Sequence, residues 1–402
     1  EAAETLGALK IMVGYAETGL FRPDDTILRS EFAKVAVAAL GLGDVAEASN
    51  YPTRFPDVVS NHWANGYINV ASNQGLVIGD DVGTFRPDDT ITYAEAMTIL
   101  VRVIGHEPSA ISKGAYPSGY LVVGAENDLS KNANAGANDP ASRGLVAQMT
   151  FNALTAKMME QTGFGENPVY TVVDKTLLKN KLKTDKLTGQ VVATSQTKLN
   201  GAGSLKKGEV QIGDEIYQTG DLDATNMLGY NVVFYTQENQ YGDNEVILIR
   251  PEAAKNVALT ISADNFESIS DLASKKLVSY WKDKETDRRA SEADVDLDAK
   301  LIYNGKSETM DNALVNLKDK AGMVNLLDTN RDGKYDLVFV TEYKNIVVDE
   351  VLPTTGKITD KYGAATIVLD PDDADLSYTI EKGTQKLALA DLKEWDVLSI
   401  AE

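Results

Sequence analysis

The feature of this sequence that most constrains its fold is a seven-residue stretch, Phe-Arg-Pro-Asp-Asp-Thr-Ile, that occurs at 21–27 and again at 85–91. Each copy leads into a pattern of apolar residues three and one positions apart, which is typical of a helix that buries one face. The apolar positions are Phe32, Val35, Ala36, Ala39 and Leu40 after the first copy, and Ala96, Ile99, Leu100, Val103 and Ile104 after the second. The proline and the two aspartates predict a turn ahead of each helix.

A further helix is expected before each repeated stretch. Residues 61–79 place Trp63, Tyr67, Val70 and Ala71 on one helical face, and residues 1–14 form the counterpart in the first copy. Each unit is therefore a helix, a turn-rich loop and a second helix. The second helix of the second copy begins with a capping box, Thr92 and Glu95, while the first copy keeps Glu31 but has Leu28 at the cap position.

A third, more divergent unit follows. Residues 116–129 match the first helix of a unit and residues 139–154 match the second helix. The apolar face of the latter consists of Val146, Met149, Ala153 and Leu154. Repeated units that cannot bury a face alone usually do so by packing on one another. We therefore expect the three units to share one core.

Three stretches carry a resemblance to a known family. The sequences FPDVVSNHWANGYI at 55–68, GTFRPDDTIT at 83–92 and ASRGLVAQM at 141–149 resemble the S-layer homology (SLH) domain of bacterial cell-surface proteins. The resemblance implies an all-α, pseudo-threefold bundle of three units. It also implies binding to a secondary polysaccharide attached to peptidoglycan, which anchors the protein to the cell wall.

The resemblance also implies where the polysaccharide binds. The family's recognition motif lies at the start of each second helix, here at Arg29, at Tyr93 in place of an arginine, and at Ser142 and Arg143. A helix start offers unpaired N–H groups, and an arginine can hold a carboxylate. The alternative for Arg29 and Arg143 is an ordinary surface cation. For Trp63 the alternatives are contact with a sugar and a place in the core.

Composition limits the classes of partner. The chain has 39 basic and 60 acidic residues and a formal charge of −21, so it lacks the basic character that nucleic-acid binding requires. It has no cysteine, which excludes disulfides, thiolate catalysis and zinc–sulfur sites. No apolar run is long enough to span a membrane. Among possible bases of the usual kind there are only His62 and His106, and neither belongs to a catalytic motif.

The rear of the chain follows a different pattern, with β-branched and aromatic runs between Gly, Asn and Asp turns. The prediction is a multidomain protein in which small β-rich modules in series follow the helical bundle. The strand Val397–Ile400 has no hairpin partner after it, so we expect the last module to be truncated. The predicted boundaries are helical units at 1–42, 43–106 and 107–162, a linker at 163–168, and β-rich modules at 169–258, 259–350 and 351–402.

One loop in the rear has the pattern of a metal site. Asp328, Asn330 and Asp332, followed by a glycine and by Asp336, repeat the first half of a calcium-binding loop in which oxygens at alternate positions converge. The twelfth position is Phe339 instead of glutamate, which excludes an EF-hand. Calcium binding and a turn that binds nothing both remain open.

These observations lead to two functional hypotheses. The first is a non-enzymatic structural protein outside the cell, anchored to the wall by its polysaccharide and self-associating through the β-rich modules into a two-dimensional S-layer, with no cofactor except, as an open question, calcium. The alternative is an adhesin or a wall-associated enzyme that uses the same anchor. Lattice formation on isolated walls would favour the first hypothesis, and activity on glycans or peptides the second.

Overall fold

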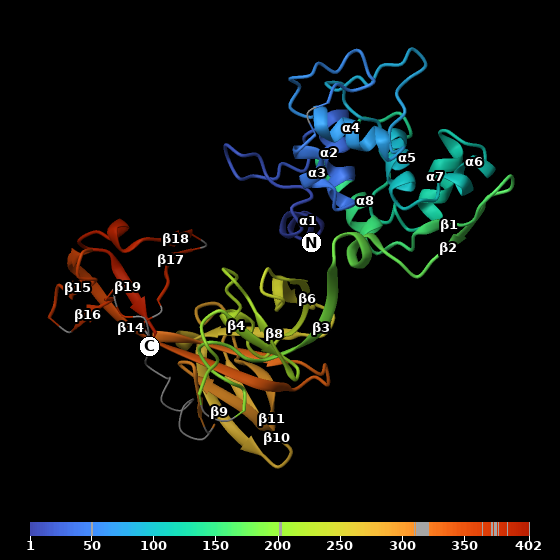
Figure 1. The fold of residues 1–402 in the computed structure, drawn as a ribbon. Helices are drawn as coiled ribbons and strands as arrows, with labels where there is room; N and C mark the ends of the chain where they lie inside the picture. The colour runs from blue at the N-terminus through green and yellow to red at the C-terminus, as the bar shows by residue number, and fades with distance from the viewer. Residues whose placement is uncertain are drawn as a thin grey trace. The chain divides into compact units, whose positions relative to one another are not determined.

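The computed structural model describes residues 1–49, 51–200, 203–308, 310, 321–363, 365–370, 373, 376, 378–383 and 385–401. The chain divides into two compact units, Glu1–Leu187 with Phe234–Leu248 and Thr188–Val233 with Ile249–Glu402. Helices occupy the front of the chain and strands occupy the rear (Figure 1). The prediction of a multidomain protein with a helical front and a β-rich rear is confirmed.

The helices follow the predicted order, but they are short and long loops join them, so "all-α" describes the front incompletely. The second helices of the three units are α2, α5 and α8, and their apolar stripes are buried except for Leu40, which is half-buried. The bounds are α1 Ala2–Ala8, α2 Arg29–Ala39, α3 Gly43–Glu47, α4 Asn65–Asn73, α5 Tyr93–Val103, α6 Glu107–Ser112, α7 Ser118–Glu126 and α8 Arg143–Thr155.

Three equivalent segments, 23–30, 87–94 and 137–144, which we call the ring segments, exchange backbone hydrogen bonds in a cycle. At their centre the amides of Ile27, Ile91 and Ala141 donate to the carbonyls of Ala141, Ile27 and Ile91, at 3.1, 3.1 and 2.9 Å. All three residues are fully buried. Because a buried amide without a partner is costly, each unit depends on the other two.

The ring segments also satisfy the first amides of the second helices, which have no partner within their own helix. The N–H groups of Arg29, Tyr93 and Arg143 donate to the carbonyls of Asp89, Asp139 and Asp25, at 2.9, 3.0 and 2.8 Å. The next amides, of Ser30, Ala94 and Gly144, donate to Pro87, Ala137 and Pro23. The first two N–H groups of each second helix therefore have partners, and the expectation that N–H groups are unpaired at these helix starts is wrong.

Helix caps complete the second helices. Thr92 and Glu95 form the predicted capping box, with Thr92 Oγ1 accepting from the Glu95 amide at 3.3 Å. In the first copy Glu31 accepts from the Leu28 amide at 2.8 Å. One prediction about the first helices is wrong: α4 begins only at Asn65, so Trp63 precedes it and is 55% exposed instead of sharing the buried face of Tyr67.

In the rear, strands β3, β4, β5, β7 and β6 close a small barrel in that order, and a larger sheet runs β16-β15-β14-β11-β10-β9, with β13 and β19 also paired to β14. The bounds are β1 Met159–Gly163, β2 Val169–Val172, β3 Thr184–Ala193, β4 Glu209–Ile212, β5 Glu215–Gln218, β6 Asn231–Glu238, β7 Asn244–Pro251, β8 Val257–Ser262, β9 Phe266–Leu272, β10 Lys275–Tyr280, β11 Ser291–Tyr303, β12 Lys306–Glu308, β13 Ala321–Asp328, β14 Tyr335–Leu352, β15 Lys357–Asp360, β16 Thr366–Val368, β17 Ile380–Lys382, β18 Gln385–Leu387 and β19 Val397–Ile400.

Several regions of the rear differ from expectation. The strand Val397–Ile400 is β19, and it pairs with Lys344–Val347 of β14, so the expectation that it lacks a partner is wrong. The undecided region 271–285 is mainly strand, in the hairpin of β9 and β10. Residues 163–168, expected to be a linker, connect the paired strands β1 and β2. The long strand β14 runs across the boundary expected at 350.

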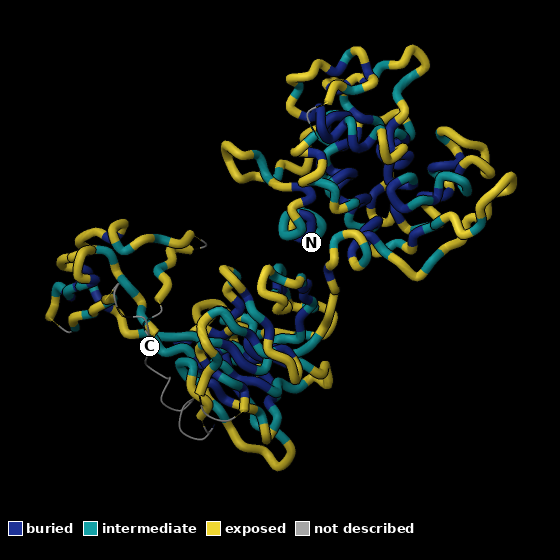
Figure 2. The backbone as a smooth tube through the Cα atoms, in the orientation of Figure 1, coloured by how far each residue is buried: buried dark blue, intermediate teal, exposed yellow. Residues whose placement is uncertain are grey.

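Buried residues gather inside the helical front and along the strands, while exposed residues follow the loops (Figure 2). In the rear, one apolar cluster joins strands β8 to β14, with Val278, Val295, Val324 and Val338 completely buried. A smaller cluster around Val348 and Ile358 supports the last strands.

Candidate functional site

Arg29, the first residue of α2, is 7% exposed. Its Nε donates to the Phe85 carbonyl at 2.7 Å and its Nη1 lies 2.7 Å from Glu95 Oε1. Its guanidinium carbon is 5.1 Å from the centre of the Phe85 ring. Burial lowers the pKa of Arg29, and the charge of Glu95 opposes this shift. The side chain thus holds the repeated stretch of the second unit against the first.

Glu95 is the carboxylate that balances this buried charge, and Arg86 also contacts it, at 2.8 Å. Burial raises the pKa of Glu95, but the hydrogen bond from the Thr92 amide and the charges of Arg29 and Arg86 outweigh burial and leave that pKa below its usual value. Glu95 is therefore ionised in the folded protein at neutral pH.

Arg143 and Tyr93 occupy the matching positions of α8 and α5, and their side chains also donate to backbone carbonyls. Arg143 Nε donates to the Phe21 carbonyl at 2.9 Å and its Nη2 donates to the Val13 carbonyl at 2.8 Å. The Tyr93 hydroxyl donates to the Ala133 carbonyl at 3.1 Å. Both side chains are buried, and Arg143 lies over the Tyr15 and Phe21 rings. Ser142 caps α8, with its Oγ accepting from the Leu145 amide at 3.2 Å.

The structure thus gives Arg29, Tyr93, Arg143 and Ser142 structural contacts in the ring. Direct contact between these residues and a polysaccharide stays a prediction. Their polar groups are largely engaged by the protein, so an exposed surface nearby is a better starting point for a ligand.

Trp63 lies apart from them, at a hollow of about 430 Å³. The hollow combines an exposed aromatic ring with a cation, a carboxylate and several amides and hydroxyls, a combination suited to a sugar. Its lining residues are Lys34, Ala46, Glu47, Ser49, Ser60, Asn61, His62, Trp63, Asn65, Gly66 and Tyr67. The sequence patterns gave no sign that Lys34, Asn61 and Glu47 line one hollow: Lys34 lies on α2, Glu47 ends α3, and Asn61 lies in the loop before α4.

Contacts within the hollow orient its side chains. The Trp63 ring stacks on His62 with centres 5.8 Å apart. The Tyr67 hydroxyl donates to Glu47 Oε1 at 2.9 Å, and burial together with this bond raises the pKa of Tyr67 to about 12. Lys34 Nζ lies 5.4 Å from the centre of the Tyr67 ring. Tyr67 therefore stays protonated, and Lys34 supplies a positive charge at the rim.

The third unit carries an equivalent of Trp63. An added Cβ at Gly66 or at Gly119 would collide with a carbonyl, of Ala46 and Ala110 respectively, so the two glycines hold matching places at the starts of α4 and α7. Three residues before them lie Trp63 and Tyr116, which are both 55% exposed. The divergent sequence of the third unit concealed Tyr116.

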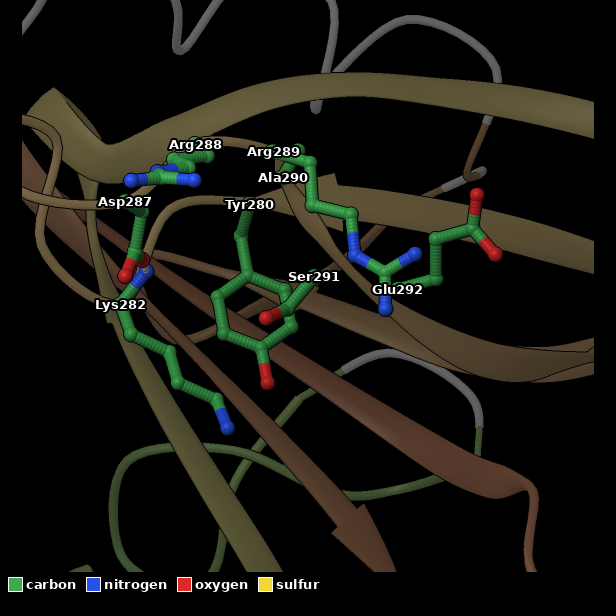
Figure 3. A pocket seen from close by; sticks show the side chains of 8 residues that line it. All are labelled: Tyr280, Lys282, Asp287, Arg288, Arg289, Ala290, Ser291 and Glu292. Carbon is green, nitrogen blue, oxygen red and sulfur yellow. Dashed lines mark hydrogen bonds between the residues drawn. The ribbon is translucent and has the colours of Figure 1, made fainter.

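A second hollow, of about 640 Å³, lies at the loop between β10 and β11 (Figure 3). Lys282, Arg288 and Arg289 surround it together with the carboxylates of Asp287 and Glu292. Its aromatic residue, Tyr280, is 9% exposed and offers little ring face. The mixed charges and the covered ring make this hollow less suited to a sugar than the one at Trp63.

The predicted calcium loop is held by its own backbone. Asp328 Oδ2 accepts from the Gly333 amide at 3.2 Å, and Asn330 Oδ1 accepts from the Asp332 amide at 2.8 Å. The Asp336 carboxylate accepts from Thr329, while burial raises the pKa of Asp336. Among the described residues no group of three or more His, Cys, Asp or Glu side chains is placed to hold a metal ion. Calcium binding at this loop stays a prediction.

One protein-family model matches part of the helical front. The model described as "S-layer homology domain" matches residues 54–97, a stretch that contains Trp63, α4 and the second ring segment. The chain therefore contains an S-layer homology domain. Within the described residues no helix has both the length and the apolar character needed to cross a membrane.

Comparison with known proteins extends the relationship along the chain. All of it aligns at 27% identity with the "surface layer protein" of Brevibacillus choshinensis, over 39% of that protein, and at 27% identity with the "middle cell wall protein" of Brevibacillus brevis, over 41%. A "cell surface protein" of Thermoanaerobacter kivui is 28% identical over 84% of the chain and 43% of its own length. The chain spans about two fifths of these relatives. The chain is thus similar over its whole length to proteins named as surface-layer and cell wall proteins.

The contacts of Arg29 predict a loss of stability when it is removed. Arg29→Ala deletes a buried hydrogen bond and a buried ion pair, and we expect the free energy of unfolding of the front to fall by about 2–4 kcal/mol. The matched control is Arg86→Ala, which removes a more exposed partner of the same Glu95 and should cost less than about 1 kcal/mol. Urea unfolding of the full chain, followed by circular dichroism at 222 nm, measures both. Equal losses would contradict the assignment.

The loop at 328–336 gives a second prediction. If calcium binds there, chelation should lower the melting temperature of the rear, and Asp332→Ala should have the same effect without chelator, because one ligand oxygen is lost. Calorimetry of the full chain with calcium and with EGTA tests this, with Asp298→Ala on the neighbouring exposed surface as the control. If neither EGTA nor Asp332→Ala changes the melting temperature of the rear, the loop is a turn that binds no calcium.

Proposed function

We propose that this protein is a structural component of a bacterial S-layer, that its front binds a secondary cell wall polysaccharide linked to peptidoglycan, and that its rear supports lateral assembly. The observation that carries the proposal is the S-layer homology match over residues 54–97, which contains the exposed aromatic of the candidate site. Similarity of the whole chain to a "surface layer protein" supports the structural function.

The three helix–loop–helix units form, in this proposal, one pseudo-threefold SLH bundle. The cyclic hydrogen bonds of the ring segments support it, because corresponding residues of the three units donate to corresponding carbonyls. The matching positions of Arg29, Tyr93 and Arg143 support it as well.

The hollow at Trp63 is the site where we expect the polysaccharide to bind. A sugar ring has an apolar face that can lie on the exposed indole, while its hydroxyls can exchange hydrogen bonds with groups such as Asn61 and Ser60. The Lys34 ammonium at the rim can pair with an acidic group of an anionic glycan. Tyr116 offers a second, simpler platform in the third unit.

Lateral association is proposed for the rear. The long strand β14 joins the larger sheet to the last strands, β15 and β19, and so links one end of this region to the other. Such a continuous sheet can transmit load between neighbouring molecules. The competing hypothesis, an adhesin or wall enzyme on the same anchor, has less support, because the relatives carry the names of surface-layer and cell wall proteins.

A substitution at Trp63 tests the anchor. We expect Trp63→Ala to weaken binding of the full chain to isolated Brevibacillus brevis walls by roughly 1–2 kcal/mol, about five- to thirtyfold, because it removes the exposed ring from the hollow. The control is Trp395→Ala, which removes a similarly exposed indole, 61% against 55%, from the rear. Co-sedimentation measures both variants.

The same assay has a second arm with walls stripped of their secondary polysaccharide, to which neither parent nor variant should bind. If Trp63→Ala and Trp395→Ala bind intact walls like the parent, the proposed site is wrong. If the parent binds stripped walls equally well, the polysaccharide is not the ligand.

A further inference from the structure

A cluster of basic residues follows the helical front in this otherwise acidic chain. Residues 175–186 contain five lysines, at 175, 179, 181, 183 and 186, and a single acidic residue, Asp185. The chain as a whole carries −21. Short lysine-rich stretches of this kind are typical of surfaces that bind polyanions.

The basic segment is fixed to the helical front. Leu177 and Leu178 are buried, and Thr176 caps the short π-helix Leu177–Lys181 by accepting from the Lys179 amide at 3.2 Å. The Lys181 carbonyl lies so close to Gly41 that an added Cβ there would be 2.7 Å away. The backbone that carries the lysines is therefore part of the same compact unit as α2 and α8.

The lysines differ in how far their charge is balanced. Lys179 Nζ lies 2.9 Å from Asp185, and both side chains are exposed. Lys186 Nζ lies about 6 Å from the ring centres of Phe151 and Tyr235. Lys181 and Lys183 are exposed, and no hydrogen bond or ion pair involves their ammonium groups within the described residues. Two unbalanced positive charges thus lie two residues apart.

The two arginines at the predicted recognition motif are not accessible in this way. Arg29 and Arg143 are buried and donate to backbone carbonyls, so a polyanion approaching the surface does not meet them first. The net charge of the chain repels such a polymer, and local cations are needed to offset that repulsion.

We propose that Lys181 and Lys183, flanked by Lys179, form an electrostatic contact surface for an anionic wall glycan, separate from the hollow at Trp63. The inference rests on the proposed function and adds a second contact to it. The ligand class is a polysaccharide with repeated carboxylate or phosphate groups. Such a contact is weak for each charge, depends on salt, and increases the rate of capture from solution.

The experiment compares the full-length parent with the double variant Lys181→Gln/Lys183→Gln. Immobilised polygalacturonate supplies carboxylates, glycerol-phosphate teichoic acid supplies phosphates, and dextran is the neutral control. At low salt we expect the variant to bind at least one of the two polyanions about five- to tenfold more weakly, and the parent to lose this advantage as NaCl rises. The parent and the variant should bind dextran equally. The polymer that shows the loss identifies the acidic group.

Two further variants make the result specific. Lys10→Gln/Lys131→Gln removes two exposed lysines of the front, one of which shares the left-handed backbone of Lys183, with φ of 56° against 52°, and should bind like the parent. Lys181→Arg/Lys183→Arg keeps the charge and should retain binding. The circular dichroism of each variant controls for folding.

Equal binding of the parent and the Lys181→Gln/Lys183→Gln variant to both polyanions at low salt would overturn the inference, as would an equal loss in the Lys10→Gln/Lys131→Gln control. Unchanged polyanion binding with reduced self-association in sedimentation would assign the lysines to a second copy of the chain and would also overturn it. The test is separate from the one on Trp63, which uses whole walls: loss of wall binding in Trp63→Ala with no effect of the lysines would leave the proposed function standing.

Discussion

The front of this protein depends on nine backbone hydrogen bonds that the three ring segments exchange in a cycle. Each segment donates three amide hydrogen bonds to the other two segments, and its carbonyls accept three hydrogen bonds from them. The backbone groups of each ring segment therefore find these partners only in the other units. Because the central residues Ile27, Ile91 and Ala141 are fully buried, water cannot replace a missing partner. This explains the repeated Phe-Arg-Pro-Asp-Asp-Thr-Ile stretch: the carbonyls of its Phe, Pro and Asp residues accept from the neighbouring unit, and its Arg takes a left-handed backbone, with φ of 49° and 60° at Arg22 and Arg86.

The ring also decides which groups remain for a ligand. The carbonyls of the ring segments accept hydrogen bonds from the first two amides of each second helix, the part of a helix that commonly binds anions. The guanidinium groups of Arg29 and Arg143 are also engaged, because they donate to the carbonyls of Phe85 and Phe21. In the proposed function, recognition falls to groups outside the ring segments, the aromatic hollow at Trp63 and the lysines beyond α8. In this proposal the predicted recognition motif has a structural role, and residues near it contact the glycan.

The sequence was sufficient for features that follow from local chemistry. The apolar spacing of Ile99, Leu100 and Val103 predicted their burial, and Thr92 with Glu95 predicted the capping box. It was insufficient where distant segments meet. The carbonyl partners of Arg29 and Arg143 lie 56 and 122 residues away, so a reading of local patterns assigned both to a surface. Trp63 fits a helical pattern, but α4 begins two residues later. β19 pairs back to β14 across fifty residues or more, which no hairpin pattern could indicate.

The central claim is that the glycan meets the hollow at Trp63 while the arginines of the ring stay with the protein. A ¹H–¹⁵N spectrum of the full chain, titrated with secondary polysaccharide from Brevibacillus brevis walls, tests it directly, since indole Nε1–H and arginine Nε–H groups give separate resonances. The account predicts that the Trp63 indole resonance shifts in proportion to bound polymer, while the Nε–H resonances of Arg29 and Arg143 keep their positions and their protection from exchange. A shift of the two arginine resonances with an unmoved Trp63 indole would contradict it.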